Sequence, residues 1–380
     1  MLMAIAWLVM GRARRTDHAS SIDGVRAAGL RKGTGGTQAG GAAALPSPAV
    51  SANGAQGMEV CGIGHVDVDP GDPAAVGNYL QDLTKDAFIR WQAAMTASGD
   101  DAARAVGLYA QLRHDGAGYD AATLGALIQL AADSRDPVAY GIAYQACAKV
   151  ATPAPDPLCG LISAAGWAKI DSDNAVPWIL MAGQQQKAGN AEAVTTAMAR
   201  AAQATRISSG GESLHAVAAP LLPRDIPPLE SMQLSVTMVG YEAAWGLPYL
   251  QDVQRLCIEA TDVDDRRRAA CARLAELLAA KGNTADMAVA GKLGPMAGWP
   301  ADRFEAMTKL RYALNQAAAE AAVAVDYRSL DCDAVQKANA YFSKRAQLGE
   351  SGLARDYLQH SGKTMDELAL EYHNSRQRPD

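Results

Sequence analysis

The stretch Cys159–Ala204, CGLISAAGWAKIDSDNAVPWILMAGQQQKAGNAEAVTTAMARAAQA, decides the fold of this 380-residue chain. Apolar side chains recur at three- and four-residue intervals from residue 175 and again from residue 191, which is the spacing of one face of a helix. Gly189 interrupts the pattern and can take the left-handed conformation that ends a helix. The stretch therefore predicts two antiparallel helices joined by a three-residue turn. One such hairpin cannot bury its apolar face alone, so neighbouring helices must stack on it.

Four residues of this hairpin follow the order of a Trp, a small residue, a turn Gly and a later Ala: Trp178, Ala182, Gly189 and Ala201. Their spacing resembles the tetratricopeptide (TPR) repeat. Gln185 stands where that family prefers Tyr, and Arg206 stands where it favours Pro. The resemblance covers about one repeat. Residues 158–183 also resemble uncharacterised extracytoplasmic helical proteins of Gram-negative bacteria, a likeness that implies no activity.

The rest of the chain predicts further helices and almost no strand, because no alternating apolar and polar run of useful length occurs. We expect an all-α fold, an irregular TPR-like array of helical hairpins (an α-solenoid), with any strand confined to residues 58–68. The Pro-rich run Pro220–Pro228 predicts a break between two halves. Besides the hairpin, the expected helices lie near 72–98, 101–113, 120–133, 137–150, 157–170, 229–246, 248–260, 266–281, 284–292, 301–322, 329–347, 350–359 and 364–376.

The sequence predicts four segments. Residues 1–15 join an apolar run, MLMAIAWLVM, to a basic one, and residues 16–57 are rich in Gly, Ala, Ser and Pro, so we expect a disordered linker there. An N-terminal helical half at 58–219 contains the hairpin at 174–204, and a C-terminal half follows at 229–380. Ten helical residues span about 15 Å, half of a membrane's hydrocarbon core. Residues 1–15 are therefore expected to be an anchor or signal remnant, a possible membrane tether, and not a complete span.

Six cysteines are present, and four of them form two close pairs. Cys147 and Cys159 lie six residues either side of Pro153, within a Pro-rich turn. Residues equidistant from a hairpin turn face each other, so this spacing predicts a disulfide where the two helices converge. The intervening prolines exclude one continuous helix between them.

Cys257 and Cys271 lie seven residues either side of Asp264 and predict a second disulfide. A single helix through residues 262–268 would instead place both on one face as buried thiols. Cys61 and Cys332 are the two remaining cysteines, so a disulfide between them is predicted by elimination. The alternative for all six is the buried thiol of a cytoplasmic protein. Disulfides would place the chain in an oxidising compartment, which we expect to be the periplasm, either free or anchored in the inner membrane facing it.

The net charge of −6 gives no indication of nucleic-acid binding. No nucleophile elbow, zinc-binding His-Glu-x-x-His, haem-attachment or phosphate-loop motif occurs, so no catalytic residue, cofactor or metal ligand is assigned. Four aromatic residues near the second-half break are candidates for partner binding, with core packing as the alternative for each. They are Tyr241, Trp245, Tyr249 and Trp299.

Two functions follow from these observations. The leading hypothesis is a non-catalytic, TPR-like protein of the cell envelope that presents a groove to a protein or peptide partner, because helical arrays form concave surfaces. The alternative is an envelope enzyme of glycan-cleaving type whose carboxylate pair forms only in the fold. A cleft with a buried Glu of raised pKa would favour the enzyme.

Overall fold

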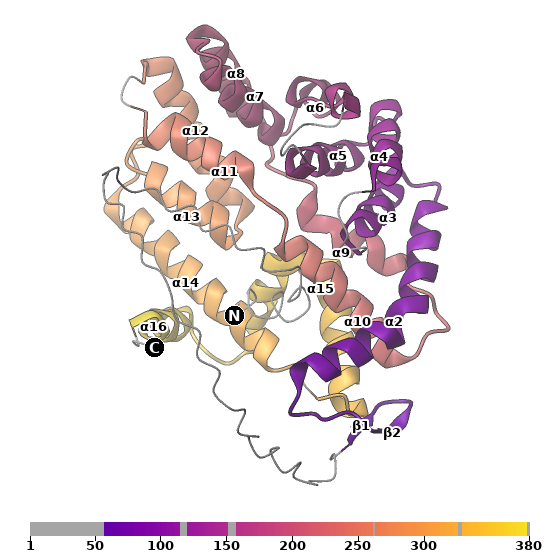
Figure 1. Ribbon diagram of the computed structural model, residues 1–380. Coiled ribbons are helices and arrows are strands. Elements are labelled where there is room, and N and C mark those ends of the chain that lie inside the picture. The colour runs from indigo at the N-terminus through magenta and orange to yellow at the C-terminus, as the bar shows by residue number, and fades with distance from the viewer. Residues whose placement is uncertain (1–56, 115–119, 151–156, 261–262, 326–328, 378–380) are drawn as a thin grey trace, which may run out of the picture.

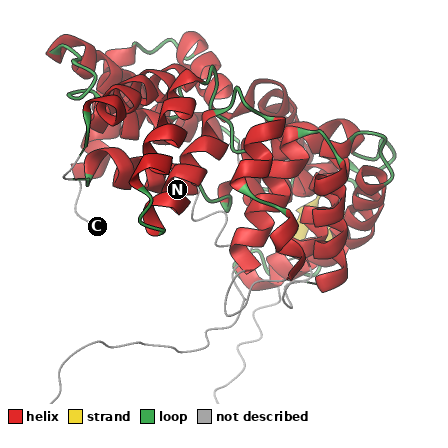
Figure 2. Cartoon of the chain, turned by 90° about the horizontal axis from the view of Figure 1, so that it is seen from above, coloured by secondary structure: helices red, strands yellow, loops and turns green. Residues whose placement is uncertain are grey.

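The computed structural model describes residues 57–114, 120–150, 157–260, 263–325 and 329–377. These residues are almost entirely helical, with a single small hairpin of strands (Figure 2). The all-α prediction is confirmed. The expected N-terminal anchor and nearly all of the expected linker, residues 1–56, lie outside the described residues.

The elements before the Pro-rich break follow the expected order closely. Strands β1 (Met58–Val60) and β2 (Gly64–Val66) form an antiparallel hairpin, within the segment where strand was expected. The helices that follow are α2 (Pro73–Thr96), α3 (Asp101–His114), α4 (Ala121–Asp133), α5 (Pro137–Val150), the 3-10 turn η1 (Pro157–Leu161), α6 (Ala164–Ile170), α7 (Ala175–Lys187), α8 (Ala191–Gln203), the 3-10 turn η2 (Gly211–Ser213), α9 (Leu214–Ala218) and the 3-10 turn η3 (Ala219–Leu221).

The second half also matches its expected helices. Residues 329–347 and 350–359 were expected as two helices, and α15 does consist of two helical segments that meet at Gly349, whose φ of 69° and ψ of 174° are not helical. The elements are α10 (Pro228–Ala243), α11 (Pro248–Val253), the π-helical turn η4 (Gln254–Ile258), α12 (Asp265–Lys281), α13 (Thr284–Leu293), α14 (Ala301–Val323), α15 (Cys332–His360) and α16 (Met365–Gln377).

The predicted helical hairpin is present as α7 and α8, which lie side by side (Figure 1). Gly189 has a φ of 74°, the left-handed conformation that a residue with a side chain adopts at a cost. Asn174 caps α7, because its side-chain oxygen accepts from the backbone N–H of Val176 at 3.1 Å. Asn190 caps α8 in the same way through Ala193 at 3.2 Å. Local capping therefore fixes both helix starts.

The helices pack in a closed circuit (Figure 1). Successive neighbours run from α2 through α3, α5, α6, α7 and α8 to α12, then through α13, α14, α15 and α10 back to α2. The short helix α9 lies inside the circuit, against α3, α10 and α15. The circuit closes where α10, the first helix after the Pro-rich break, packs against α2, whereas the last helix, α16, packs on α14.

The three disulfides pair the cysteines as the sequence predicted. Cys147 is joined to Cys159 with the Cα atoms 5.6 Å apart, and Cys257 is joined to Cys271 at 5.8 Å. Cys61 and Cys332 are joined at 4.6 Å and link the β-hairpin to the first residue of α15. The backbone N–H of Cys61 also donates to the carbonyl of Leu330 at 2.8 Å. Across the described ranges, no helix is both long and apolar enough to span a membrane.

Candidate binding pocket

Three of the four aromatic residues proposed for binding are buried, with Tyr241 and Trp245 6% exposed and Tyr249 fully covered. Of the two roles considered for them, partner binding and core packing, core packing is the one that describes where these three residues lie. Tyr249 donates its hydroxyl hydrogen to buried Asp286 at 2.6 Å. The Trp245 ring lies against Gly211, where any side chain would collide with it. Helices surround these rings on all sides, which periodicity alone does not reveal.

Trp299 is half-buried and is engaged by neighbours within the chain. Its indole N–H donates to the carboxylate of Glu276 at 2.6 Å. The Arg303 guanidinium lies 4.2 Å from the ring centroid and pairs with the same carboxylate at 2.5 Å. Arg303 therefore makes a cation–π contact with the Trp299 ring and an ion pair with Glu276. The ring is already in contact with side chains of the same chain.

A pocket of about 460 Å³ opens between α9, α10 and α15. His215, Ser235 and Phe342 are buried and form its floor, whereas Ser343 and Gln347 are exposed at its rim. Among the residues whose side chains the structure describes, the lining is His215, Ala216, Ala219, Pro220, Leu222, Ser231, Ser235, Asn339, Phe342, Ser343, Ala346 and Gln347. None of these described lining residues is acidic, Lys or Arg. The volume of the pocket lies within the range of small-molecule sites.

The Pro-rich break positions this pocket. The chain turns at Gly210, whose φ is 81°, passes through the short turns around α9, and re-enters a helix at Pro228. A short helix followed by a break leaves room between α9 and α10 that a continuous helix would fill. Asn339 on α15 donates its side-chain N–H to the carbonyl of Pro228 at 2.7 Å and holds α15 against the start of α10.

His215 is the distinctive residue of the pocket. It is 1% exposed, and neither ring nitrogen has a hydrogen-bond partner among the described residues. The Phe342 ring meets it edge-on, with centroids 6.0 Å apart. Burial, together with the smaller effect of the positive charge of Arg345, lowers the pKa of His215 to about 4. The imidazole is therefore neutral near pH 7 and offers one donor and one acceptor.

An ion pair lies directly behind His215. Glu242 accepts from the guanidinium of Arg345 at 2.5 Å with one carboxylate oxygen, and from the backbone N–H of His215 at 2.8 Å with the other. Burial raises the pKa of Glu242, and Arg345 opposes that change. Both carboxylate oxygens are thus used to hold α9, α10 and α15 together, and neither residue lines the pocket.

The pocket contains residue types found in serine hydrolases, but they do not form a catalytic contact here. Such a hydrolase needs a serine hydroxyl hydrogen-bonded to a histidine ring, and an acid bonded to the other ring nitrogen. The ring nitrogens of His215 make no such bond, and Glu242 contacts the His215 backbone instead of its ring.

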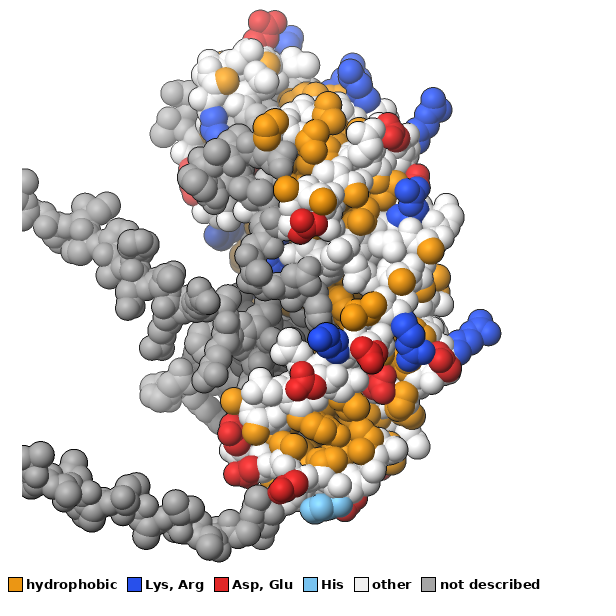
Figure 3. Space-filling model, turned by 45° about the vertical axis from the view of Figure 1, so that its right-hand side comes forward, with side chains coloured by type: hydrophobic (Ala, Val, Ile, Leu, Met, Phe, Trp, Pro, Cys, Tyr) orange, Lys and Arg blue, Asp and Glu red, His pale blue; other side chains and the backbone are white. Residues whose placement is uncertain are grey.

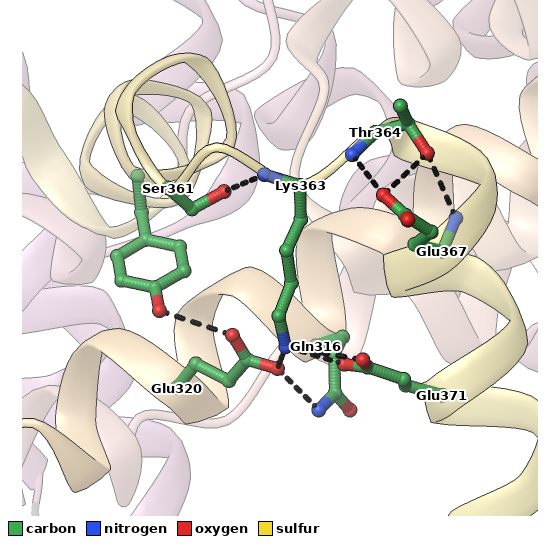
Figure 4. A network of polar contacts seen from close by, with 8 residues as sticks. Gln316, Glu320, Ser361, Lys363, Thr364, Glu367 and Glu371 are labelled. Carbon is green, nitrogen blue, oxygen red and sulfur yellow. Dashed lines mark hydrogen bonds and ion pairs between the residues drawn. The ribbon is translucent and has the colours of Figure 1, made fainter.

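A pair of carboxylates does meet at the surface between α14 and α16 (Figure 4). Lys363 donates to Glu320 at 2.8 Å and to Glu371 at 2.9 Å, and Tyr357 donates to Glu320 at 3.0 Å. Hydrogen bonds from Lys363, Gln316 and other neighbours lower the pKa of Glu320 to about 2, although burial opposes them. A glycosidase acid needs the opposite shift. This network is suited to joining helices.

The surface shows no dominant charge on the face drawn in Figure 3, where acidic and basic side chains are interspersed among apolar areas. Among the residues that the structure describes, no three His, Cys, Asp or Glu side chains gather as a metal site would require.

Sequence reasoning missed the pocket. Nothing in the sequence around His215 distinguishes it from an ordinary core segment. The one usable signal was the break at Pro220–Pro228, which marks where helix packing is interrupted. Comparison with known proteins adds no assignment, since no family model, curated protein or solved structure matches the chain.

Proposed function

We propose that this chain is a non-catalytic helical protein of the cell envelope that presents the pocket between α9, α10 and α15 to a protein or peptide partner. The observation that carries the proposal is the pocket of about 460 Å³ itself, which lies between three helices and is lined by apolar side chains, by buried His215 and Ser235, and by the exposed polar residues Ser343 and Gln347.

The compartment follows from the cysteines. Three disulfides indicate an oxidising environment outside the cytoplasm. We propose the periplasm, with the apolar residues 1–15 as a tether or signal. The spacing of the α7–α8 hairpin supports a TPR-like relationship, and proteins of that kind act by binding other proteins.

Peptide display tests this proposal. Oxidised full-length protein is immobilised and used to select from a random dodecamer library. Ala346 lines the pocket, so the bulky side chain of Ala346→Phe should block it and abolish capture of the selected peptides. Ala340 lies on the same helix, is exposed and is not part of the lining, so Ala340→Phe is the matched control and should capture them normally. Equal capture by Ala346→Phe and the unmodified protein would refute the pocket as the binding surface.

The second candidate is an envelope enzyme of glycan-cleaving type, and one observation favours it. Glu242 is a buried carboxyl beside the pocket whose pKa is raised by burial. Against it, both Glu242 oxygens are already bonded and neither points to a partner carboxylate. Release of reducing ends from a chito-oligosaccharide, lost in Glu242→Gln and kept in Ala340→Phe, would establish the enzyme and overturn the binding proposal.

A further inference from the structure

We propose that residues 1–15 dock on one side of α2 in their own chain. That side is formed by five residues at helical spacing, which we call the α2 stripe: Tyr79, Asp82, Leu83, Asp86 and Ile89. The stripe shares no residue with the described lining of the pocket between α9, α10 and α15. The proposal therefore goes beyond the proposed function and does not depend on it.

The α2 stripe is a row of apolar and acidic side chains at the surface. Its members follow one another at intervals of three or four residues, so they lie on one side of the helix. Tyr79 and Leu83 are half-buried and pack against the apolar cluster between the β-hairpin, α10 and α15. Ile89 is 51% exposed. The stripe therefore leaves apolar surface in contact with solvent.

The stripe lies in an acidic part of the molecule. Asp82 and Asp86 are exposed, and neither has a hydrogen-bond or ion-pair partner among the described residues. Residues 57–90 contain six acidic side chains and two basic ones, and the guanidinium of Arg90 is already paired with Asp225 at 2.8 Å. Figure 3 shows acidic side chains around an apolar area in its lower part, where Figure 1 places the β-hairpin and the start of α2. A segment that fits this surface combines apolar side chains with positive charge.

The first 15 residues of the chain have that chemistry. The side chains of residues 1–10, MLMAIAWLVM, are apolar, and Arg12, Arg14 and Arg15 follow them. Ten helical residues span about 15 Å, and residues 79–89 of α2 cover about the same length. Burial against another apolar surface stabilises an exposed apolar run. Opposite charges on the two surfaces favour this face of the molecule over a neutral or basic one.

The covalent connection favours this segment over a separate molecule. Residues 16–56 join it to residue 57, which directly precedes β1. Met58 of that strand packs on the same apolar cluster as Tyr79 and Leu83. A flexible chain of 41 residues spans on the order of 35 Å. Such a linker keeps the segment at a high effective concentration beside the stripe, so even a weak contact is populated within one molecule.

Photo-crosslinking in the full oxidised chain tests the contact. Trp7 is replaced by p-benzoylphenylalanine, and the irradiated protein is mapped by mass spectrometry. We expect cross-links within one chain that fall mainly on α2. The same label at Leu45, in the connecting segment, should give no preferred site. Cross-links that avoid α2 would overturn the proposal. Cross-links between two chains would assign the stripe to a second copy and overturn the intramolecular contact.

Charge reversal shows whether the acids of the stripe direct the contact. Asp82→Lys combined with Asp86→Lys should lower the yield of cross-links to α2 by about fivefold or more, because two attractive pairs become repulsive. Glu192→Lys combined with Glu305→Lys is the matched control. It changes the net charge equally at exposed positions on α8 and α14, and it should leave the yield unchanged.

The three arginines provide the reciprocal variant. Replacing Arg12, Arg14 and Arg15 by Glu should lower the yield to a similar extent, and combining this change with the two Lys substitutions on α2 should restore it. Restoration in the combined variant cannot result from a loss of folding, so it identifies a direct contact. Circular dichroism checks that each variant remains helical. A yield that neither reversal changes, or that the combination does not restore, would overturn the proposal.

Discussion

Glu242 on α10 and Arg345 on α15 are 103 residues apart in the chain, yet their carboxylate and guanidinium groups meet at 2.5 Å with both side chains less than 10% exposed. The same carboxylate binds the backbone of α9 through His215. Three helices of the pocket therefore converge on one acid. This contact joins the three helices that form the pocket.

Removing that acid should destabilise the fold strongly. Glu242→Ala leaves the Arg345 charge buried without a partner, so we expect the free energy of unfolding to fall by about 3–5 kcal/mol in urea denaturation. Glu350 also approaches Arg345, at 3.7 Å, but is 60% exposed. Glu350→Ala is the control and should cost less than about 1 kcal/mol. Similar losses in both variants would show that the buried pair is not the main contact.

Replacing His215 should have the opposite effect. His215→Phe keeps a planar ring against Phe342 and removes two buried polar atoms without partners. We expect the free energy of unfolding to rise by about 1–2 kcal/mol at pH 7. His360→Phe on the exposed surface should change it by less than about 0.5 kcal/mol. A destabilised His215→Phe protein would mean that the ring nitrogens make bonds that the structure does not contain.

Lowering the pH should decrease the free energy of unfolding because of the lowered pKa of His215. His215 has a pKa of about 4 when folded and an ordinary value of 6.5. Between these values the unfolded chain takes up a proton that the folded chain does not, so the free energy of unfolding falls as pH drops from 6.5 towards 4. The total effect is about 3 kcal/mol. It is absent above pH 6.5.

The measurement is the difference in stability between His215→Phe and the unmodified protein. That difference should widen from pH 7.5 to pH 4.5. Glu242, whose folded pKa is raised, contributes in the opposite direction, but it is present in both proteins and cancels from the comparison. A difference that is constant with pH would contradict the lowered pKa of His215.

The three disulfides should contribute unequally to the free energy of unfolding. The Cys61–Cys332 bond spans 271 residues, whereas the other two span 12 and 14. In the chain-entropy account, replacing Cys61 and Cys332 by Ala should cost about 5 kcal/mol, and replacing either short pair about 3 kcal/mol. The free energies of unfolding of the three double variants, measured by urea denaturation, give the order of the three contributions. A smaller loss for the long pair than for both short pairs would contradict this order.

The oxidised state itself is testable in protein taken from its native compartment. Non-reducing peptide mapping should recover the three linked peptides that contain the observed pairs. Free thiols at all six positions would contradict the proposed envelope location.

The sequence predicted local structure well, because helix ends are encoded by neighbouring residues. Thr364 and Glu367 illustrate this: they form a capping box at the start of α16, in which the Thr364 backbone N–H donates to the Glu367 carboxylate at 2.7 Å and the Glu367 backbone N–H donates to the Thr364 hydroxyl oxygen at 3.2 Å. The close cysteine pairs were predictable for the same reason, since a turn brings them together. The Cys61–Cys332 pair followed only by elimination.

The pocket could not be predicted, because its floor joins residues 215, 235 and 342 from three separate helices. No local sequence pattern indicates that these three residues come together in the fold. The aromatic candidates were misplaced for a related reason. Tyr241 lies on α10, which packs against α2, α3 and α15, so helix neighbours cover the face that a lone amphipathic helix would leave to solvent.

The bond between Cys61 and Cys332 also sets how the protein responds to mechanical force. Tension applied between residue 57 and residue 377 enters at the β-hairpin, crosses the disulfide and leaves through α15 and α16. The helices from α2 to α14 lie outside that covalent path, so the intact bond prevents their part of the chain from being extended. A pulling experiment should therefore extend only the last two helices, and adding a reductant should release the remaining length of chain.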